Sequence, residues 1–248
     1  MKISIITATY NNEKTIEQTV QSVLNQSYKN IEYIIIDGNS TDNTLQIVNK
    51  YAGKINHIIS ETDKGMYDAL NKGIMKASGD IIGFLHADDF YPANDVLEKV
   101  EHTFKVYGTQ SVYGDLDYVS ANDTEKIIRK WKSGSFAFDE LKKGWMPPHP
   151  TFFVLRDVYW KYGFFNLKYK IAADYDLMLR FLGKYKISAA YIPEVLVKMR
   201  WGGKSNRSIK NIFIKSKEDY QALKKNKVGG LYSLFMKNFR KINQFFKK

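Results

Sequence analysis

Short apolar runs alternate with segments of helical periodicity over residues 1–110, and this alternation constrains the fold more than any other feature. Four of the runs predict strands, at residues 2–8, 31–37, 56–60 and 81–86. Segments with helical spacing follow them, at residues 13–26, 42–51, 65–77 and 95–107. Strands that alternate with helices in this way form βαβ units on a mostly parallel sheet with flanking helices. The sequence therefore predicts an α/β, Rossmann-like fold.

The rest of the chain is less regular, and the composition of the sequence limits the classes of protein to which it can belong. Strand-like segments at 111–119, 151–155 and 186–192 and a helix at 174–183 continue the predicted domain. The absence of cysteine excludes a disulfide framework and a thiolate metal site. The N-terminal residues lack the apolar segment of a signal peptide, and no window approaches the ~18 apolar residues of a membrane span. We therefore expect a cytoplasmic protein.

Polar residues gather where three of the predicted strands end. The first strand runs into TATYNN at residues 7–12, the second ends in Asp37, and the fourth ends in Asp88 and Asp89, just after His86. Ligands of open α/β sheets bind at the carboxyl ends of the strands. No G-x-G-x-x-G follows the first strand and the chain has no P-loop, so dinucleotide and P-loop sites are disfavoured.

Asp88 and Asp89 end an apolar run, where a buried carboxylate is costly unless a positive partner satisfies it. Two explanations are open. The pair could form a turn that caps the next helix, or it could hold Mg²⁺ or Mn²⁺ on a substrate diphosphate, because these cations prefer one or two carboxylates plus phosphate oxygens. Two roles are also open for Asp37: it could be an acid in a turn, or it could accept hydrogen bonds from a base or ribose.

Two further acids stand at the start of the predicted helix at 174–183, in IAADYDLMLRF. Asp176 is best explained as an acid that complements the helix dipole. Asp174 comes at or before the first turn, where a carboxylate can project into a cavity. Spacing alone leaves Asp174 equally compatible with a capping role and with a general base.

Other polar residues lie in loops of the second half. His149, in MPPHPTFF, is either an ordered loop histidine or a ligand to metal or substrate. Arg200, Lys204 and Ser205, in the glycine-containing KMRWGGKSN, form either a solvated loop or a loop that closes over a diphosphate.

The order of these motifs resembles the family 2 glycosyltransferases of the GT-A fold over about residues 1–200. The resemblance rests on TYN and DGNSTDNT after strands, on N-x-G before a G-D strand, and on HADD followed by ADYDLMLR. It implies an inverting transfer of a sugar from a nucleotide-diphosphate donor to an acceptor hydroxyl. The likeness to bacterial O-antigen and capsule enzymes implies a lipid-linked glycan acceptor in surface polysaccharide synthesis.

The resemblance also implies a role for individual residues. Asp174 matches the catalytic base, and Asp88 with Asp89 occupies the motif that binds Mn²⁺ or Mg²⁺, with Asp89 as the first choice for the metal contact. His86 stands where that motif has its first acid. The nucleoside, uridine by family habit, would be held by Thr7, Ala8, Thr9, Tyr10, Asn11, Asp37, Gly65 and Asp88. Residues 1–110 would bind the nucleotide sugar and residues 111–200 the acceptor.

The positive charge is concentrated in a C-terminal tail. Residues 198–248 hold 15 of the 38 basic and two of the 26 acidic residues, so this segment carries a net charge of +13 and the rest −1. Within residues 229–248 one helix face would collect Leu231, Phe235, Phe239, Ile242 and Phe246, and the remainder would hold Lys237, Arg240, Lys241, Lys247 and Lys248. Such a helix either packs on its own domain or lies on an anionic membrane surface, which we favour.

Two other functional classes remain. A non-catalytic nucleotide-sugar sensor is disfavoured because Asp88, Asp89 and Asp174 are all present. A nucleic-acid-binding protein is disfavoured because the body is nearly neutral and lacks a known nucleic-acid motif.

Overall fold

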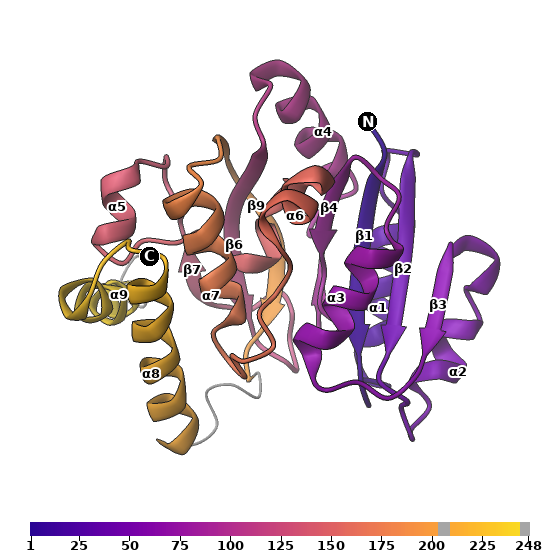
Figure 1. The fold of residues 1–248 in the computed structure, drawn as a ribbon. Coiled ribbons are helices and arrows are strands. Elements are labelled where there is room, and N and C mark those ends of the chain that lie inside the picture. Colours follow the sequence, from indigo (N-terminus) through magenta and orange to yellow (C-terminus); the bar gives the residue numbers. More distant parts are fainter. Residues whose placement is uncertain (203–208, 244–248) are drawn as a thin grey trace.

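The structure is a computed structural model that describes residues 1–202 and 209–243, and it has a central mixed sheet between layers of helices (Figure 1). The strands are β1 (Ile3–Thr9), β2 (Ile31–Asp37), β3 (His57–Ser60), β4 (Ile81–Phe84), β5 (Asp89–Phe90), β6 (Ser111–Val119), β7 (Ile127–Trp131), β8 (Phe153–Leu155) and β9 (Ala189–Arg200). The helices are α1 (Ile16–Leu24), α2 (Thr44–Asn49), α3 (Met66–Lys76), α4 (Val96–Tyr107), α5 (Phe138–Lys142), α6 (Arg156–Tyr162), α7 (Ala173–Met178), α8 (Ile209–Lys225) and α9 (Leu231–Asn243). Short helical segments are η1 (Ala52–Lys54), η2 (His149–Thr151) and the π-helical η3 (Leu179–Lys184).

The first half of the sheet is parallel, with the strand order β3-β2-β1-β4. β1 pairs with β2 without interruption, from Ile3↔Ile31 to Thr9↔Asp37. These four strands lie within two residues of the segments that their apolar runs predict. β1, β2 and β4 are buried, and Ile58 and Ile59 of the half-buried β3 pack against the two cores. The expected α/β fold with a mostly parallel sheet is confirmed, and the carboxyl ends of β1, β2 and β4 lie at one edge.

The second half of the sheet continues in the order β8-β6-β9-β5, with β7 on β6. β8 joins the halves by pairing antiparallel to both β4 and β6, and β9 pairs parallel to β6. The prediction for β9 was partly wrong. It begins at Ala189 and extends to Arg200, so Lys198 and Arg200 lie in a strand instead of a loop. The long pairing with β6, up to Val119↔Arg200, keeps this segment extended.

Alternating residues of the strands build two cores, one on each face of the sheet. Ile34 and Ile36 of β2 face the core that α3, α6, α7 and α8 cover. Tyr33 and Ile35 face the core under α1, α2 and α4. The period-2 alternation of a strand explains this division.

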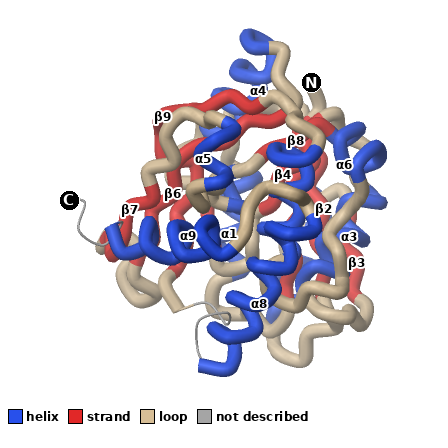
Figure 2. The backbone as a smooth tube through the Cα atoms, turned by 60° about the vertical axis from the view of Figure 1, so that its left-hand side comes forward, coloured by secondary structure: helices blue, strands red, loops and turns tan. Residues whose placement is uncertain are grey.

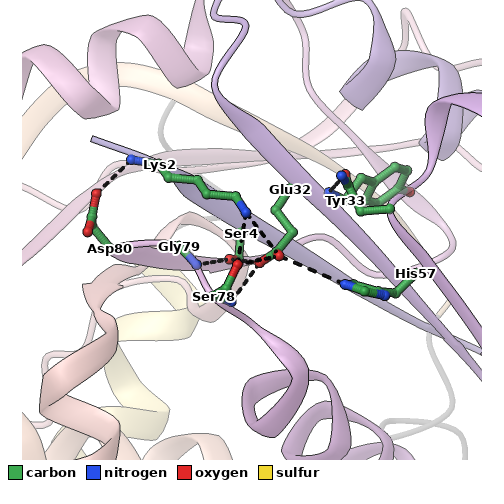
Figure 3. Close-up of polar contacts among 9 residues, drawn as sticks. Lys2, Ser4, Glu32, Tyr33, His57, Ser78, Gly79 and Asp80 are labelled. Carbon is green, nitrogen blue, oxygen red and sulfur yellow. Dashed lines mark hydrogen bonds and ion pairs between the residues drawn. The ribbon is translucent and has the colours of Figure 1, made fainter.

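A polar network ties the strands together near the start of β1 and β2 (Figure 3). The buried carboxylate of Glu32 accepts hydrogen bonds from the Ser4 hydroxyl at 2.5 Å, from the backbone and hydroxyl of Ser78 and from Lys2. Burial alone would raise the pKa of Glu32, but these hydrogen bonds outweigh it and lower the pKa to about 2. The network lies far along the strands from their carboxyl ends and is structural.

The C-terminal helices α8 and α9 belong to the folded body. They lie side by side at the side of the molecule opposite β3 in Figure 1, and Figure 2 shows them in the turned view. α8 packs on α7 and buries Ala222 and Leu223, while α9 packs on α5. Within residues 1–202 and 209–243, no helix is long and apolar enough to cross a membrane.

Candidate active site

Loops after β1, β2 and β3 meet at the carboxyl edge of the sheet. A methyl group added to Gly38 would lie 3.2 Å from Asp63 Oδ2 and 3.5 Å from the Tyr10 side chain, so the three loops touch. The Tyr10 side chain is exposed, and Asn11 bridges to the loop after β2 through hydrogen bonds with Ser40 and Thr41. Gly65, with a φ of +109°, begins α3 beside them. This cluster combines the aromatic face of Tyr10 with the carboxylate of Asp63, which forms an ion pair with Lys72 at 2.5 Å.

Other residues expected at the nucleoside are less accessible. Thr7 is buried and its hydroxyl hydrogen-bonds Tyr33 at 3.2 Å, while the Thr9 hydroxyl donates to Asn12. Asp37 is buried as well, and its carboxylate accepts hydrogen bonds from Ser40 and Ser60. In this structure Asp37 therefore acts as the acid of the turn after β2. Ala8 is half-buried between Thr7 and Thr9.

Asp88 and Asp89 are adjacent but have different surroundings. Asp89 lies in β5, is 0% exposed, and neither of its carboxylate oxygens has a hydrogen-bond partner within ordinary geometric limits among the described residues. Burial raises the pKa of Asp89 well above its ordinary value; the charge of Asp88 adds to this effect and that of Arg200 opposes it. Asp88 is half-buried and lines a cavity. Of the two acids, Asp88 is the one with access to a ligand.

The cavity has a volume of about 310 Å³ and lies between the loop after β1 and the end of β9. Its lining includes Asn11, Thr15, Asp88, Arg200 and Trp201. Arg200 is held there by hydrogen bonds from its guanidinium to the backbone oxygen of Asp88, at 2.5 Å, and to the side chain of Gln18. Arg200 is thus the cation that faces the two acids, and Lys204 and Ser205 lie outside the described residues.

Two histidines lie between this acidic pair and the second half of the sheet. The rings of His86 and His149 are 5.7 Å apart, and His149 stacks on Phe84. Burial lowers the pKa of both, that of His149 to about 4; the charge of Asp174 opposes this effect at both rings. His86 Nδ1 and His149 Nε2 make no hydrogen bond with the described residues. Two neutral imidazoles therefore carry unused hydrogen-bonding capacity beside the site.

Asp174 lies in the first turn of α7, where the sequence places it, and α3 holds it. The hydroxyl of Tyr67 donates to Ile171 O at 2.7 Å and to Asp174 Oδ1 at 3.2 Å, and the backbone N–H of Tyr175 donates to the same oxygen at 2.8 Å. No described residue donates to Oδ2, which leaves it for an outside hydroxyl. Tyr67 thus fixes a carboxylate from the second half of the chain against a helix of the first half.

Asp176 has a structural role, which comes from contacts with other side chains and was expected from the helix dipole alone. It is buried, accepts a hydrogen bond from Asn226 Nδ2 at 3.0 Å and lies 3.5 Å from Lys225 Nζ. Lys225 is the last residue of α8 and Asn226 follows it, so Asp176 joins α7 to the end of that helix.

Sequence reasoning missed Glu218, a residue of α8. Its buried carboxylate accepts hydrogen bonds from three consecutive backbone N–H groups, those of Lys170, Ile171 and Ala172, at 2.9, 2.9 and 3.0 Å. These residues lead directly into Asp174. The only signal was that Glu218 and Asp219 are the two acids of a basic segment, and this does not indicate which N–H groups Glu218 binds.

We expect Glu218→Gln to act on the position of Asp174. The new amide nitrogen would face a backbone N–H, and hydrogen bonds to a charged acceptor contribute about 1.5–3 kcal/mol each. We expect kcat to fall at least about tenfold with the KM for the donor nearly unchanged, because a small displacement of a reacting group is costly. Steady-state kinetics would measure both.

Glu140→Gln is the matched control, because Glu140 also contacts a C-terminal helix, through Arg240, but not the loop at 170–172. It should lower the melting temperature slightly and leave kcat unchanged. If both variants lost kcat equally, Glu218 would contribute to general stability and would not specifically position Asp174.

The arrangement suits a reaction between an anionic ligand and a hydroxyl. Among residues 1–202 and 209–243, no three His, Cys, Asp or Glu side chains form a ready-made metal cage. Asp88 still fits a hard divalent cation, since such ions often use one or two carboxylates and take other oxygens from phosphate and water. Asp174, whose Oδ2 has no hydrogen-bond donor among the described residues, fits a general base.

Comparison with known families agrees with this geometry. The profile of glycosyl transferase family 2 matches residues 4–163. The chain belongs to this family. A "PGL/p-HBAD biosynthesis glycosyltransferase" of Mycobacterium bovis is 31% identical over 217 residues, which cover 86% of this chain and 82% of that protein. An "uncharacterized glycosyltransferase" of Haemophilus influenzae is 47% identical over 100 residues, which cover 39% of this chain and 40% of that protein.

Solved structures show that this family 2 glycosyltransferase has the GT-A fold. TarS 1–349 of S. aureus in complex with UDP-GlcNAc has a TM-score of 0.69 at 18% identity; the match covers 92% of this chain but 66% of TarS 1–349. The mannosyltransferase PcManGT of Pyrobaculum calidifontis, in complex with GDP-Man and Mn²⁺, has a TM-score of 0.67 at 17% identity, over 96% of this chain and 69% of that one.

Proposed function

We propose that this glycosyltransferase moves a sugar from a nucleotide-diphosphate sugar, with a UDP-sugar as first choice, to an acceptor hydroxyl with inversion at the anomeric carbon. The observation that carries the proposal is the arrangement of Asp174, which has one oxygen fixed by Tyr67 and the other unbonded among the described residues. The bound UDP-GlcNAc of TarS and GDP-Man of PcManGT support a nucleotide-sugar donor.

Residues 1–110, together with Arg200 at the end of β9, bind the donor in this proposal. The exposed ring of Tyr10 and the carboxylate of Asp63 receive the base and ribose beside Gly65. Asn11 and Arg200 line the cavity at Asp88, where Arg200 neutralises a diphosphate. The guanidinium suits this task because it presents several donors to phosphate oxygens.

Residues 111–200 supply the acceptor side and the base. Asp174 Oδ2 takes the proton of the acceptor hydroxyl as its oxygen attacks the anomeric carbon from the face opposite the diphosphate. The new glycosidic bond forms while the bond from the anomeric carbon to the diphosphate oxygen breaks, and its electron pair leaves with the diphosphate. His149 is buried next to His86 and stays a neutral group within the electrostatic influence of Asp174.

Mn²⁺ or Mg²⁺ would be held chiefly by Asp88, with the buried Asp89 directly behind it. Such a cation supplies charge stabilisation to the departing diphosphate. The favoured acceptor is a lipid-linked glycan of surface polysaccharide, of the O-antigen or capsule kind. The name of the mycobacterial relative, a "PGL/p-HBAD biosynthesis glycosyltransferase", supports a role in a biosynthetic pathway.

The test is a thermal-shift panel of UDP, GDP, dTDP and CMP, each with and without Mn²⁺. A turnover assay then uses sugar donors that carry the nucleotide with the largest shift. Ligands that bind only the folded state stabilise it by about 2.7 kcal/mol at 100 times their Kd. For a chain of this size that corresponds to a rise of several degrees, since about 2–4 °C follows from each kcal/mol. We expect one nucleotide to stand out in the presence of Mn²⁺.

Binding of one nucleotide without turnover of any of its sugars would favour a sensor on the same fold. No shift with any nucleotide would contradict the proposed donor site.

A further inference from the structure

The outward face of α9 is apolar. Leu231, Tyr232, Phe235 and Phe239 recur at spacings of one helix face and are between 48% and 71% exposed. The spacing is the one that predicted an amphipathic helix, but the apolar side points to solvent. Contiguous exposed apolar patches on a soluble protein mark interaction sites.

The inward face of α9 buries two polar residues, Ser233 and Lys237, beside the partly buried Leu234, and these contacts hold the helix in this orientation. Lys237 is buried, forms an ion pair with Asp219 at 2.7 Å and lies over the ring of Tyr175 at 3.2 Å. A methyl group added to Gly144 would lie 2.3 Å from the backbone nitrogen of Lys237, so α9 touches the chain after α5 directly. Rolling α9 to bury Phe235 would bring the Lys237 charge out and lose these contacts. The sequence pattern assigned Lys237 to the solvated side, and the structure corrects this.

The charge of the same region is one-sided. The two acids of residues 198–248 are Glu218 and Asp219, and both are buried and bound to groups of this chain. The described part of α8 and α9 therefore presents no carboxylate of its own to solvent. Arg240 of α9 is paired with Glu140 of α5, and the exposed cations include Lys217 and Lys224 of α8. A surface that combines exposed phenylalanines with cations is complementary to an anionic lipid bilayer.

We propose that the outward face of α9 docks on an anionic phospholipid bilayer, with Leu231, Tyr232, Phe235 and Phe239 inserted at the boundary between headgroups and acyl chains. An amphipathic helix in this position inserts its apolar face about 5–10 Å deep. The helix is anchored through Lys237 and Asp219, next to Glu218, which holds the loop before Asp174. If the proposed function is correct, docking brings the base to the same surface as a lipid-linked acceptor.

The geometry favours a bilayer over a second copy of the chain. A symmetric contact through α9 would bring together two copies of a segment, residues 198–248, whose net charge is +13, and like charges repel. The structure does not describe the side chains of residues 241–248. These include Ile242 and Phe246 of the predicted apolar face and the basic residues Lys241, Lys247 and Lys248.

The test is co-sedimentation of the full chain with vesicles of equal parts phosphatidylcholine and phosphatidylglycerol, compared with pure phosphatidylcholine. The test variant is Phe235→Gln with Phe239→Gln. The matched control is Val106→Gln with Tyr107→Gln, which removes two similarly exposed apolar side chains from α4. The substituted residues lie at the surface, and circular dichroism would check that each variant is folded.

We expect the natural sequence to bind the anionic vesicles, the α9 variant to bind at least about tenfold less, and the α4 control to bind normally. Added salt should weaken binding in part, because it screens only the ionic contribution. Absence of binding to anionic vesicles, or equal binding by the α9 variant, would overturn the proposal. Vesicle binding does not depend on turnover, so this result is separate from the test of the enzyme activity.

A mass in solution that falls from dimer to monomer in the α9 variant, without vesicle binding, would instead assign the face to a second copy.

Discussion

Asp174→Asn should lower kcat by about 10²–10⁴-fold, the range for loss of a general base. Asparagine keeps the size of the side chain and can still accept the hydrogen bonds from Tyr67 and from the backbone of Tyr175 through its oxygen. The amide cannot take the proton of an acceptor hydroxyl. Stopped or continuous assays of released nucleoside diphosphate would give kcat, and the thermal shift with the donor nucleotide should stay unchanged.

Asp176→Asn is a matched control for this variant, since it makes the same chemical change two residues along the same helix. Asp176 contacts Asn226 and Lys225 instead of the site. Its loss should lower the melting temperature, because Lys225 and Arg180 lose a buried acid, while kcat per folded molecule stays near normal. If Asp174→Asn retained near-normal turnover, another group would have to be the base.

Asp88→Asn should abolish the part of nucleotide binding that depends on Mn²⁺ and lower kcat by about 10²–10³-fold, since metal stabilisation of a leaving diphosphate is worth several kcal/mol. The reason is access: Asp88 lines the cavity, whereas Asp89 is enclosed in β5. The measurement is the Mn²⁺-dependent increase in melting temperature with the nucleotide.

Asp89→Asn distinguishes the two acids. The side chain is buried and close to isosteric with asparagine, so its effect should fall on stability and leave a measurable Mn²⁺ response. The opposite result, with the Mn²⁺ response lost in Asp89→Asn and kept in Asp88→Asn, would return the metal contact to Asp89 as the motif alone suggests.

The features that could be predicted from the sequence are those encoded by neighbouring residues. The parallel half of the sheet follows from local pattern, because β1 to β4 are short apolar runs divided by amphipathic helices, and the position of Asp174 follows from its motif. The same motifs identify the family. Each of these signals spans a few neighbouring residues.

Pairing between strands far apart in the sequence determined the length of β9 and the position of Arg200. β9 continues to Arg200 because β6 lies beside it, which no residue within 193–200 indicates by itself. Arg200 reaches the acids only because β9 also pairs with β5 at Asp89↔Met199.

The direction of α9 is the clearest case. Its sequence alone determined an amphipathic helix, and the usual expectation is that the apolar side packs inward. The tertiary structure placed Asp219 and Gly144 beneath Lys237 and so turned the polar side inward. Local periodicity determines which residues share a face of a helix, but only the neighbours in space, here a buried carboxylate that needs a cation, decide which face is buried.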